Sequence, residues 1–242
     1  MGYPSIHFPQ VDSTNLEAKR LIDSGEAMHG LLISADFQTQ GRGQLGRDWH
    51  SEEAQNAMLS IVLAPQALSV KSQFSLNIIA SLAVAEVIED YGLQVQVKWP
   101  NDIYVSDNKI CGILIQNFLQ GDIIQHAIIG IGLNVNQLTW PKEVPNPTSL
   151  ALELSKPLDR LEIINSIAHS VMARYDAIAH DNNQLRKPYL DKLYRRGEIS
   201  QFEVAGELIH GEIIGIDDTG QLMVAHDNVL KAYQHGDISL VL

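Results

Sequence analysis

The segment from Gln94 to Val135 most constrains the fold, because its apolar runs are joined by very short turns. Asp107-Asn108 and Gln120-Gly121-Asp122 are typical of hairpin turns. Connections this short join only antiparallel neighbours, since a parallel pair needs a crossover of about a dozen residues or more. The segment therefore predicts an antiparallel block, with strands over residues 95–97, 103–105, 110–118 and 123–135.

Apolar runs elsewhere predict the remaining strands and the helices of this part of the chain. Residues 30–36 and Met58 to Ala64 read as strands, and residues 72–91 as a helix that stops at Gly92. Further helices are expected over residues 148–154, from Asp159 to His180, and from Asn182 to about Tyr194. The expected buried stripes are Phe74, Ile78, Leu82, Ala85 and Ile88 on the first helix, and Leu161, Ile164, Ala168, Val171, Tyr175 and Ile178 on the long one.

Arg195-Arg196-Gly197 marks an expected boundary, because the pattern beyond it is β only. Short apolar runs alternate there with turns such as Asp217-Asp218-Thr219-Gly220. Roughly 45 residues in five short strands suit a small barrel with little core of its own. We therefore expect an α+β chain with a larger unit over residues 1–195 and a smaller one over residues 196–242.

The charge balance limits the classes of function. A formal net charge of −12 disfavours non-specific nucleic-acid binding, which needs a basic face. Cys111 is the single cysteine, so no internal disulfide is possible, and Met1 to Phe8 lacks the pattern of a signal peptide. No apolar run approaches the roughly 20 residues of a membrane span. We expect a soluble cytoplasmic protein, and the scattered histidines give no metal-site spacing.

The segment Gly41-Arg42-Gly43-Gln44-Leu45-Gly46-Arg47, followed by Asp48-Trp49, reads as an anion cradle. Glycine lets backbone approach a ligand, and arginine offers a fork of donors for carboxylate or phosphate. Its GxGxxG spelling matches the dinucleotide-binding motif, but that motif must open a helix, whereas this loop runs towards a strand. A protein kinase is excluded because HRD and DFG elements are missing. The structural alternative is a long hairpin turn.

A second polar cluster, Lys98-Trp99-Pro100-Asn101-Asp102, follows a predicted strand. The ammonium of Lys98 would neutralise charge developing on a phosphate or carboxylate oxygen. Asn101 would fix the turn or a ligand, and Asp102 would hold a metal or pin the loop. Taken alone, the cluster fits a strand end with an asparagine turn and a solvated lysine better than a ligand site.

Three further motifs have both structural and functional interpretations. Gly112 inside a strand indicates close approach of backbone or ligand, while Cys111 beside it suits a small buried side chain. Gly130-Ile131-Gly132 precedes Asn134, which would contact a base or phosphate, unless the glycines mark a bulge. Ser13-Thr14-Asn15 begins a predicted helix ending near Gly25, and Thr14 with Glu17 has the spacing of a capping box.

The combination of motifs is more specific than any part. GRGxxGRxW, KWPND, KxxGIL and GIGxN occur in this order at residues 41–49, 98–102, 109–114 and 130–134, and this order resembles the biotin protein ligases over the whole chain. The resemblance implies a fold like that of class II aminoacyl-tRNA synthetases, a mostly antiparallel sheet with helices on one side, plus a C-terminal SH3-like barrel. It leaves no room before Ser13 for the N-terminal DNA-binding domain of the repressor-type members.

The resemblance also implies an activity: ATP-dependent activation of biotin as biotinyl-5′-AMP, then transfer to a lysine of the biotin carboxyl carrier domain of acetyl-CoA carboxylase. It implies Mg²⁺ with the ATP, no DNA or membrane partner, and admits a homodimer. Lys98 and Arg42 would be catalytic. The implied biotin-binding residues are Ser13, Thr14, Asn15, Gln38, Gly41, Arg42, Gly43, Gln44, Lys98 and Gly112, and the implied nucleotide-binding residues are Arg47, Trp49, Asn101 and Asn134.

Two other functions were considered, and the chain differs from the family's usual pattern at one position. A lipoate or octanoate ligase or transferase belongs to the same superfamily, but its RRxSGGG-like segment is not found. A protein that only senses biotin or a nucleotide would bind without turnover, and Lys98 disfavours it. The family commonly has arginine where this chain has Gln44, so we expect somewhat weaker retention of the adenylate.

Overall fold

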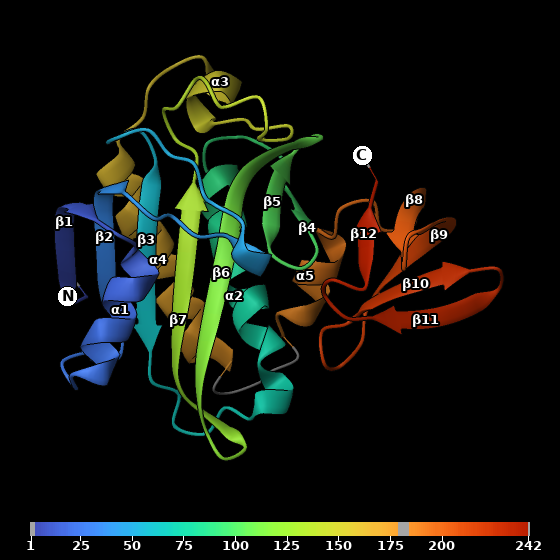
Figure 1. Ribbon diagram of the computed structural model, residues 1–242, viewed down its shortest axis with the longest axis horizontal. Coiled ribbons are helices and arrows are strands. Elements are labelled where there is room, and N and C mark those ends of the chain that lie inside the picture. The colour runs from blue at the N-terminus through green and yellow to red at the C-terminus, as the bar shows by residue number, and fades with distance from the viewer. Residues whose placement is uncertain (1–2, 179–183, 242) are drawn as a thin grey trace.

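The computed structural model describes residues 3–178 and 184–241 and contains a seven-stranded sheet (Figure 1). In spatial order its strands are β1 (Ser5–Val11), β2 (Leu31–Gln38), β3 (Ala57–Leu63), β7 (Ile123–Leu133), β6 (Asn108–Gln120), β5 (Asp102–Val105) and β4 (Gln96–Lys98). The expected antiparallel block is confirmed, because β3, β7, β6, β5 and β4 pair antiparallel in that order. Its first hairpin turn lies at Ser106-Asp107, one residue before the expected position.

The edge strand β1 was not predicted. It runs parallel to β2, whereas β2 pairs antiparallel with β3. Pro9 interrupts its sequence pattern, and proline within a run is tolerated only at a sheet edge, where its missing N–H is not needed. The strand therefore occupies the position that its proline allows.

Helices cover both faces of the large sheet, so the expectation of helices on one side was wrong (Figure 1). α2 (Phe74–Glu89) and α4 (Arg160–Ile178) share one core with Leu32 and Ile61 of the sheet. α1 (Thr14–Asp23) packs on the other face, where Ala18 joins a second cluster with Leu31 and Ile33. The uninterrupted apolar start of β2 is the sequence counterpart of this double coverage.

The predicted helical stripes are only partly correct. On α4 the buried side chains include Ile163 and Ile167, whereas Leu161 is exposed. α2 is buried on most sides, because it lies between the sheet and α4 rather than at the surface. The remaining helices are α3 (Leu150–Leu154) and α5 (Arg186–Asp191), and the expected start of the latter at Asn182 falls outside the described residues.

The C-terminal part forms a separate antiparallel sheet, in agreement with the five predicted strands. Its strands are β8 (Ile199–Val204), β9 (Glu207–Ile216), β10 (Leu222–His226), β11 (Val229–Tyr233) and β12 (Ile238–Leu240). This unit leans on the large sheet, since the Trp99 indole donates a 2.8 Å hydrogen bond to the Gly220 carbonyl. Among the helices of the described residues, none has the length and apolarity to cross a membrane.

Candidate active site

A cavity of about 800 Å³ lies where the loop after β2, the start of α1, strands β4–β7 and the C-terminal sheet meet. Every residue that the sequence predicts for the site lines this cavity except Gly41. Those residues come from segments more than 100 positions apart, from Ser13 to Asn134. The structure thus brings the predicted motifs together at one place.

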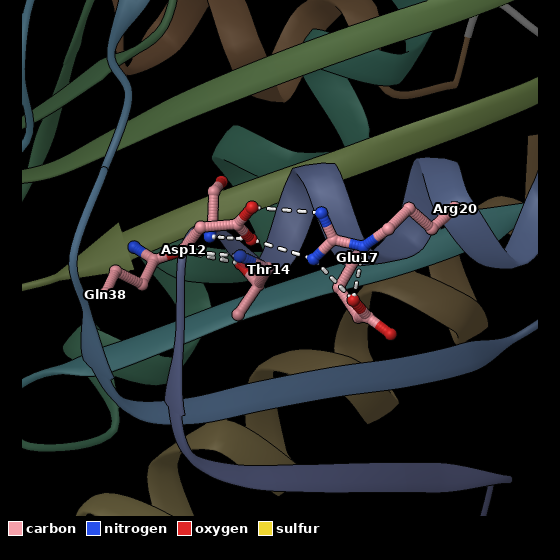
Figure 2. Close-up of polar contacts among 6 residues, drawn as sticks. Asp12, Thr14, Glu17, Arg20 and Gln38 are labelled. Carbon is pink, nitrogen blue, oxygen red and sulfur yellow. Dashed lines mark hydrogen bonds and ion pairs between the residues drawn. The ribbon is translucent and has the colours of Figure 1, made fainter.

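The start of α1 forms the polar end of the cavity, and the predicted capping box is wrong. Ser13 rather than Thr14 is the N-cap residue, and its side chain makes no capping hydrogen bond. The backbone N–H and the hydroxyl of Thr14 both donate to Gln38 Oε1, at 2.7 and 3.1 Å (Figure 2). Glu17 instead accepts from Arg20 Nε at 2.7 Å. The polar side chains of Ser13 and Thr14 at the start of α1 therefore line the cavity and do not cap the helix.

A buried network continues from Thr14 into the sheet. The Ser60 hydroxyl donates to Asn15 Oδ1 at 2.6 Å and lies 2.8 Å from Thr14 Oγ1. Asn15 Nδ2 in turn donates to Gln116 Oε1 at 3.2 Å. A Cβ added at Gly130 would lie 2.1 Å from Asn15 Oδ1, so glycine is required where the amide crosses β7. This end of the site is fixed before any ligand arrives.

The glycine-rich loop crosses in front of β7 and β6 (Figure 1) and is bonded mainly to itself. Gly43 N–H donates to the Arg47 carbonyl at 2.7 Å, and Trp49 N–H donates to the Gly41 carbonyl at 3.0 Å. A Cβ at Gly41 would lie 2.6 Å from the Trp49 carbonyl oxygen, so a larger residue does not fit at this position. Arg42 and Arg47 are exposed at the mouth of the cavity.

Trp49 anchors the loop on two glycines of the sheet. Gly112 and Gly132 are cross-strand partners on β6 and β7. A Cβ on them would approach the indole to 3.0 and 2.5 Å, so the group that lies close to Gly112 is the Trp49 side chain and not the backbone or ligand that we expected. The Lys109 ammonium lies 5.8 Å from the indole centroid. The indole N–H is buried and meets no acceptor among the described residues.

Lys98 ends β4 half-buried in the cavity rather than solvated. Its ammonium donates to the Tyr104 hydroxyl at 3.4 Å and lies 5.3 Å from that ring's centroid. Burial lowers the pKa of Lys98, the carboxylate of Asp102 opposes this, and nearby Lys109 lowers the pKa further. Asp102 is itself paired with Lys109 at 2.7 Å. Cations therefore gather here in a chain that is acidic overall.

Asn101 and Asn134 are more buried than their predicted role suggests. The Asn101 side chain donates to the Ile113 carbonyl at 2.6 Å, and that of Asn134 donates to the Thr148 carbonyl at 2.9 Å. Both amide nitrogens are therefore used within the protein. Asn134 Oδ1 is buried without a partner among the described residues, and it is the group with remaining hydrogen-bonding capacity.

Sequence reasoning missed several residues that line the cavity: Tyr104, Trp140, Tyr194 and His235. Trp140 stands next to Pro141 in a loop whose prolines indicate only a turn. His235 packs edge-to-face on Trp99 with ring centroids 5.9 Å apart, and burial lowers its pKa. A tryptophan within a proline-containing loop was the available signal for Trp140, and no sequence signal pointed to His235.

This arrangement defines an α+β catalytic domain of the class II aminoacyl-tRNA synthetase-like type with a C-terminal β domain. The model of the Biotin/lipoate A/B protein ligase family matches residues 7–134. The chain belongs to this family. The matched range contains all four motifs on which the resemblance was based, so the predicted family is confirmed.

Individual relatives agree with this assignment. Bifunctional ligase/repressor BirA of Bacillus subtilis (strain 168) is 32% identical over 99% of this chain and 75% of its own length. Biotin--[acetyl-CoA-carboxylase] ligase of Mycobacterium tuberculosis is 31% identical over 95% of this chain and 86% of its own length. The solved biotin protein ligase of Aquifex aeolicus in complex with biotin and ATP aligns with a TM-score of 0.82 and 28% identity, covering 98% of both chains.

Proposed function

We propose that this protein is an ATP-dependent biotin ligase that forms biotinyl-5′-AMP and passes the biotinyl group to a lysine of a carrier domain. The observation that carries the proposal is a single cavity with a hydrogen-bonding end at Ser13 and a cationic end at Lys98. Biotin has the same division, with a neutral ureido ring at one end and a carboxylate at the other. The cavity volume of about 800 Å³ lies in the range of small-molecule sites.

The polar end suits the ureido ring. Ser13, Thr14 and Asn15 are 3%, 4% and 6% exposed, and Gln38 holds the first turn of α1 in place. A ring with N–H donors and a carbonyl acceptor needs fixed partners of both kinds, and hydroxyl groups supply both. The Ser13 hydroxyl, which is not used for capping, is one such group. Gly112, which the resemblance assigns to biotin, lines the same cavity.

The cationic end suits the first chemical step. A carboxylate oxygen of biotin attacks the α-phosphorus of ATP; the new O–P bond forms as the bond to the β-phosphate oxygen breaks and pyrophosphate leaves. Negative charge grows on the phosphoryl oxygens, so fixed cations lower the barrier. Lys98 donates to the Tyr104 hydroxyl, and Arg42 and Arg47 line the cavity from the loop, so these three cations would bind the phosphates.

The second step needs protection from water more than a further catalyst. The acceptor lysine attacks the carbonyl carbon of the mixed anhydride, the C–O bond to AMP breaks, and the amine loses its proton. Hydrolysis competes for the same carbon, so a covering loop raises the yield of transfer. The glycine-rich loop, with Gly41, Gly43 and Gln44, is positioned for this covering role.

The nucleotide would occupy the side of the cavity formed by Arg47, Trp49, Asn101 and Asn134. Asn134 Oδ1 is the buried acceptor that would receive an amino group there. Mg²⁺ enters in this scheme with ATP as part of the substrate. Within the residues the structure describes, no group of three or more His, Cys, Asp or Glu side chains could hold a metal ion.

The domain division and the setting complete the proposal. Residues 1–195 form the catalytic unit and residues 196–242 the C-terminal unit, which borders the cavity through His235 and Ser239. The acceptor is the biotin carboxyl carrier domain of acetyl-CoA carboxylase, and the reaction takes place in the cytoplasm. A homodimer is compatible with this scheme, and neither DNA nor a membrane is required by it.

Purified protein incubated with biotin, Mg-ATP and a carrier domain tests the proposal. We expect biotin-dependent release of pyrophosphate and a biotinyl group on the acceptor lysine. Lipoate or octanoate in place of biotin is the specificity arm, and turnover with these acids alone would reassign the substrate. Biotin binding without pyrophosphate release would leave a sensing protein and overturn the ligase proposal.

A further inference from the structure

An ion pair behind the polar end of the site is built around the backbone of Ser13. Asp12 lies between β1 and α1, and its Oδ1 accepts from the Ser13 N–H at 2.7 Å. The same carboxylate accepts hydrogen bonds from both terminal nitrogens of Arg20, at 2.8 and 2.9 Å (Figure 2). Arg20 Nε donates in addition to Glu17. One guanidinium thus joins the last turn of α1 to the residue before its first turn.

The geometry distinguishes this pair from ordinary surface ion pairs. The side chains are only partly covered, with 51% exposure for Arg20 and 30% for Asp12. Exposed pairs contribute little unless the contact is bidentate or part of a network, and this contact is both. The paired guanidinium lowers the pKa of Asp12 to about 2, so the carboxylate stays charged at every working pH.

The backbone that Asp12 holds belongs to the residues whose side chains line the cavity. Asp12 holds the Ser13 N–H, and Gln38 holds the N–H of Thr14. Two consecutive amides at the start of α1 are therefore held by side chains. The Ser13 hydroxyl is left free of capping duty, and both Ser13 and Thr14 line the cavity.

We infer that Asp12 and Arg20 are positioning residues for the ring-binding end of the site: they hold the Ser13–Thr14 peptide in the orientation that binds biotin. This inference rests on the proposed function, because it takes that end of the cavity as the biotin side. Neither residue touches the substrate in this scheme. Their loss weakens biotin binding and leaves ATP binding at the cationic end intact.

Biotin affinity measured by titration calorimetry without ATP, together with the KM values for biotin and for ATP, tests the inference. Arg20→Ala should weaken biotin binding about tenfold, the scale of losing a hydrogen bond to a charged group, with the KM for ATP unchanged. Arg20→Lys keeps the charge without the fork and should restore part of the affinity. Lys19→Ala is the matched control, because it removes an exposed ion pair with Asp23 on the same helix.

The variant Ser13→Ala separates this inference from the proposed function. If Arg20 acts through Ser13, the double variant should lose much less affinity than the product of the two single losses. Weaker biotin binding in Ser13→Ala but not in Arg20→Ala would overturn the positioning role alone. Unchanged biotin binding in both would overturn the biotin side of the cavity as well. Equal losses in Arg20→Ala and Lys19→Ala, or equal losses for biotin and ATP, would reduce the pair to a helix-stabilising contact.

Discussion

The two ends of the cavity differ in how much of their order exists without a ligand. At the start of α1 the side chains of Ser13, Thr14 and Asn15 are almost wholly buried, and the Thr14 hydroxyl is bonded to Gln38. In the glycine-rich loop, Arg42 and Arg47 are exposed, and the loop's backbone bonds are largely internal. The hydrogen-bonding end is therefore ordered before a ligand binds, whereas the arginines of the glycine-rich loop gain partners only when charged substrates bind.

This difference matches the chemistry assigned to each end. A neutral ring is recognised by fixed hydrogen bonds, and preorganisation avoids the cost of ordering them on binding. Phosphates carry their own charge and attract cations from an open loop, which must also let pyrophosphate out. Lys98 is the ordered residue of the cationic end, because it is half-buried and donates to the Tyr104 hydroxyl. Substitutions at the two ends should therefore change different measurable quantities.

The largest effect is expected at Lys98, in the cationic end. Lys98→Ala should lower the rate of adenylate formation by at least ~10²-fold, the scale of one preorganised charge donor. Because Lys98 faces the reacting carboxylate, the loss should appear in kcat more than in the melting temperature. Single-turnover pyrophosphate release measures it, and near-normal turnover would remove Lys98 from the mechanism.

The pH profile of the unmodified protein and of Lys98→Arg provides the control. The active form of Lys98 is protonated, and its pKa lies below the 10.5 of an ordinary lysine. Activity should therefore fall as pH rises towards 10.5, earlier than an exposed lysine would require. Arginine stays charged throughout, so the alkaline decline should move to higher pH in Lys98→Arg. Identical profiles for the two proteins would assign the decline to another group.

The second contrast is between two glycines, one at each end. Gly130→Ala forces a Cβ to within 2.1 Å of the buried Asn15 amide. We expect a loss of roughly 1–3 kcal/mol in the free energy of unfolding, as for overpacking elsewhere, together with weaker biotin binding. The melting temperature should fall by about 2–4 °C for each kcal/mol lost in a chain of this size, which thermal unfolding measures.

Gly43→Ala is the matched variant in the loop. Gly43 has an ordinary extended backbone, and an added Cβ would lie 3.3 Å from the Arg47 carbonyl, which the loop can accommodate. The melting temperature should stay nearly unchanged, while substrate binding weakens. A large drop in melting temperature for Gly43→Ala, or none for Gly130→Ala, would reverse the distinction between a fixed and an open end.

The same contrast explains what the sequence could predict. Local signals placed the loop after β2, Lys98 at a strand end and the close approach at Gly112, and the structure brings them together. Contacts between residues distant in the sequence could not be predicted. The residues around Thr14, for example, do not indicate that it bonds to Gln38, 24 positions away. The sequence predicted a helix that begins at Ser13-Thr14-Asn15 and ends near Gly25, but not the face of the sheet on which this helix packs.

The wrong capping-box prediction has a clear physical origin. The spacing of Thr14 and Glu17 fits a capping box, but both side chains find stronger partners, in Gln38 and Arg20, that only the folded chain supplies. Tertiary hydrogen bonds overrule local propensity at such polar positions.

The smallest effect is expected at Gln44, where this chain departs from the family's usual arginine. Gln44 lies in the short 3₁₀ turn Gln44–Gly46 and lines the cavity, and its Oε1 is buried without a partner among the described residues. Gln44→Arg adds a charge near the phosphate, and partly exposed ion pairs contribute about 0.2–1 kcal/mol, or up to roughly fivefold in a rate constant. The half-life of bound biotinyl-5′-AMP should lengthen by that factor, while biotin binding without ATP stays the same. Dissociation of labelled adenylate measures the first quantity and calorimetry the second. An unchanged half-life would mean that Arg42 and Arg47 already retain the adenylate fully, and a changed biotin affinity would mean that the loop also shapes the polar end.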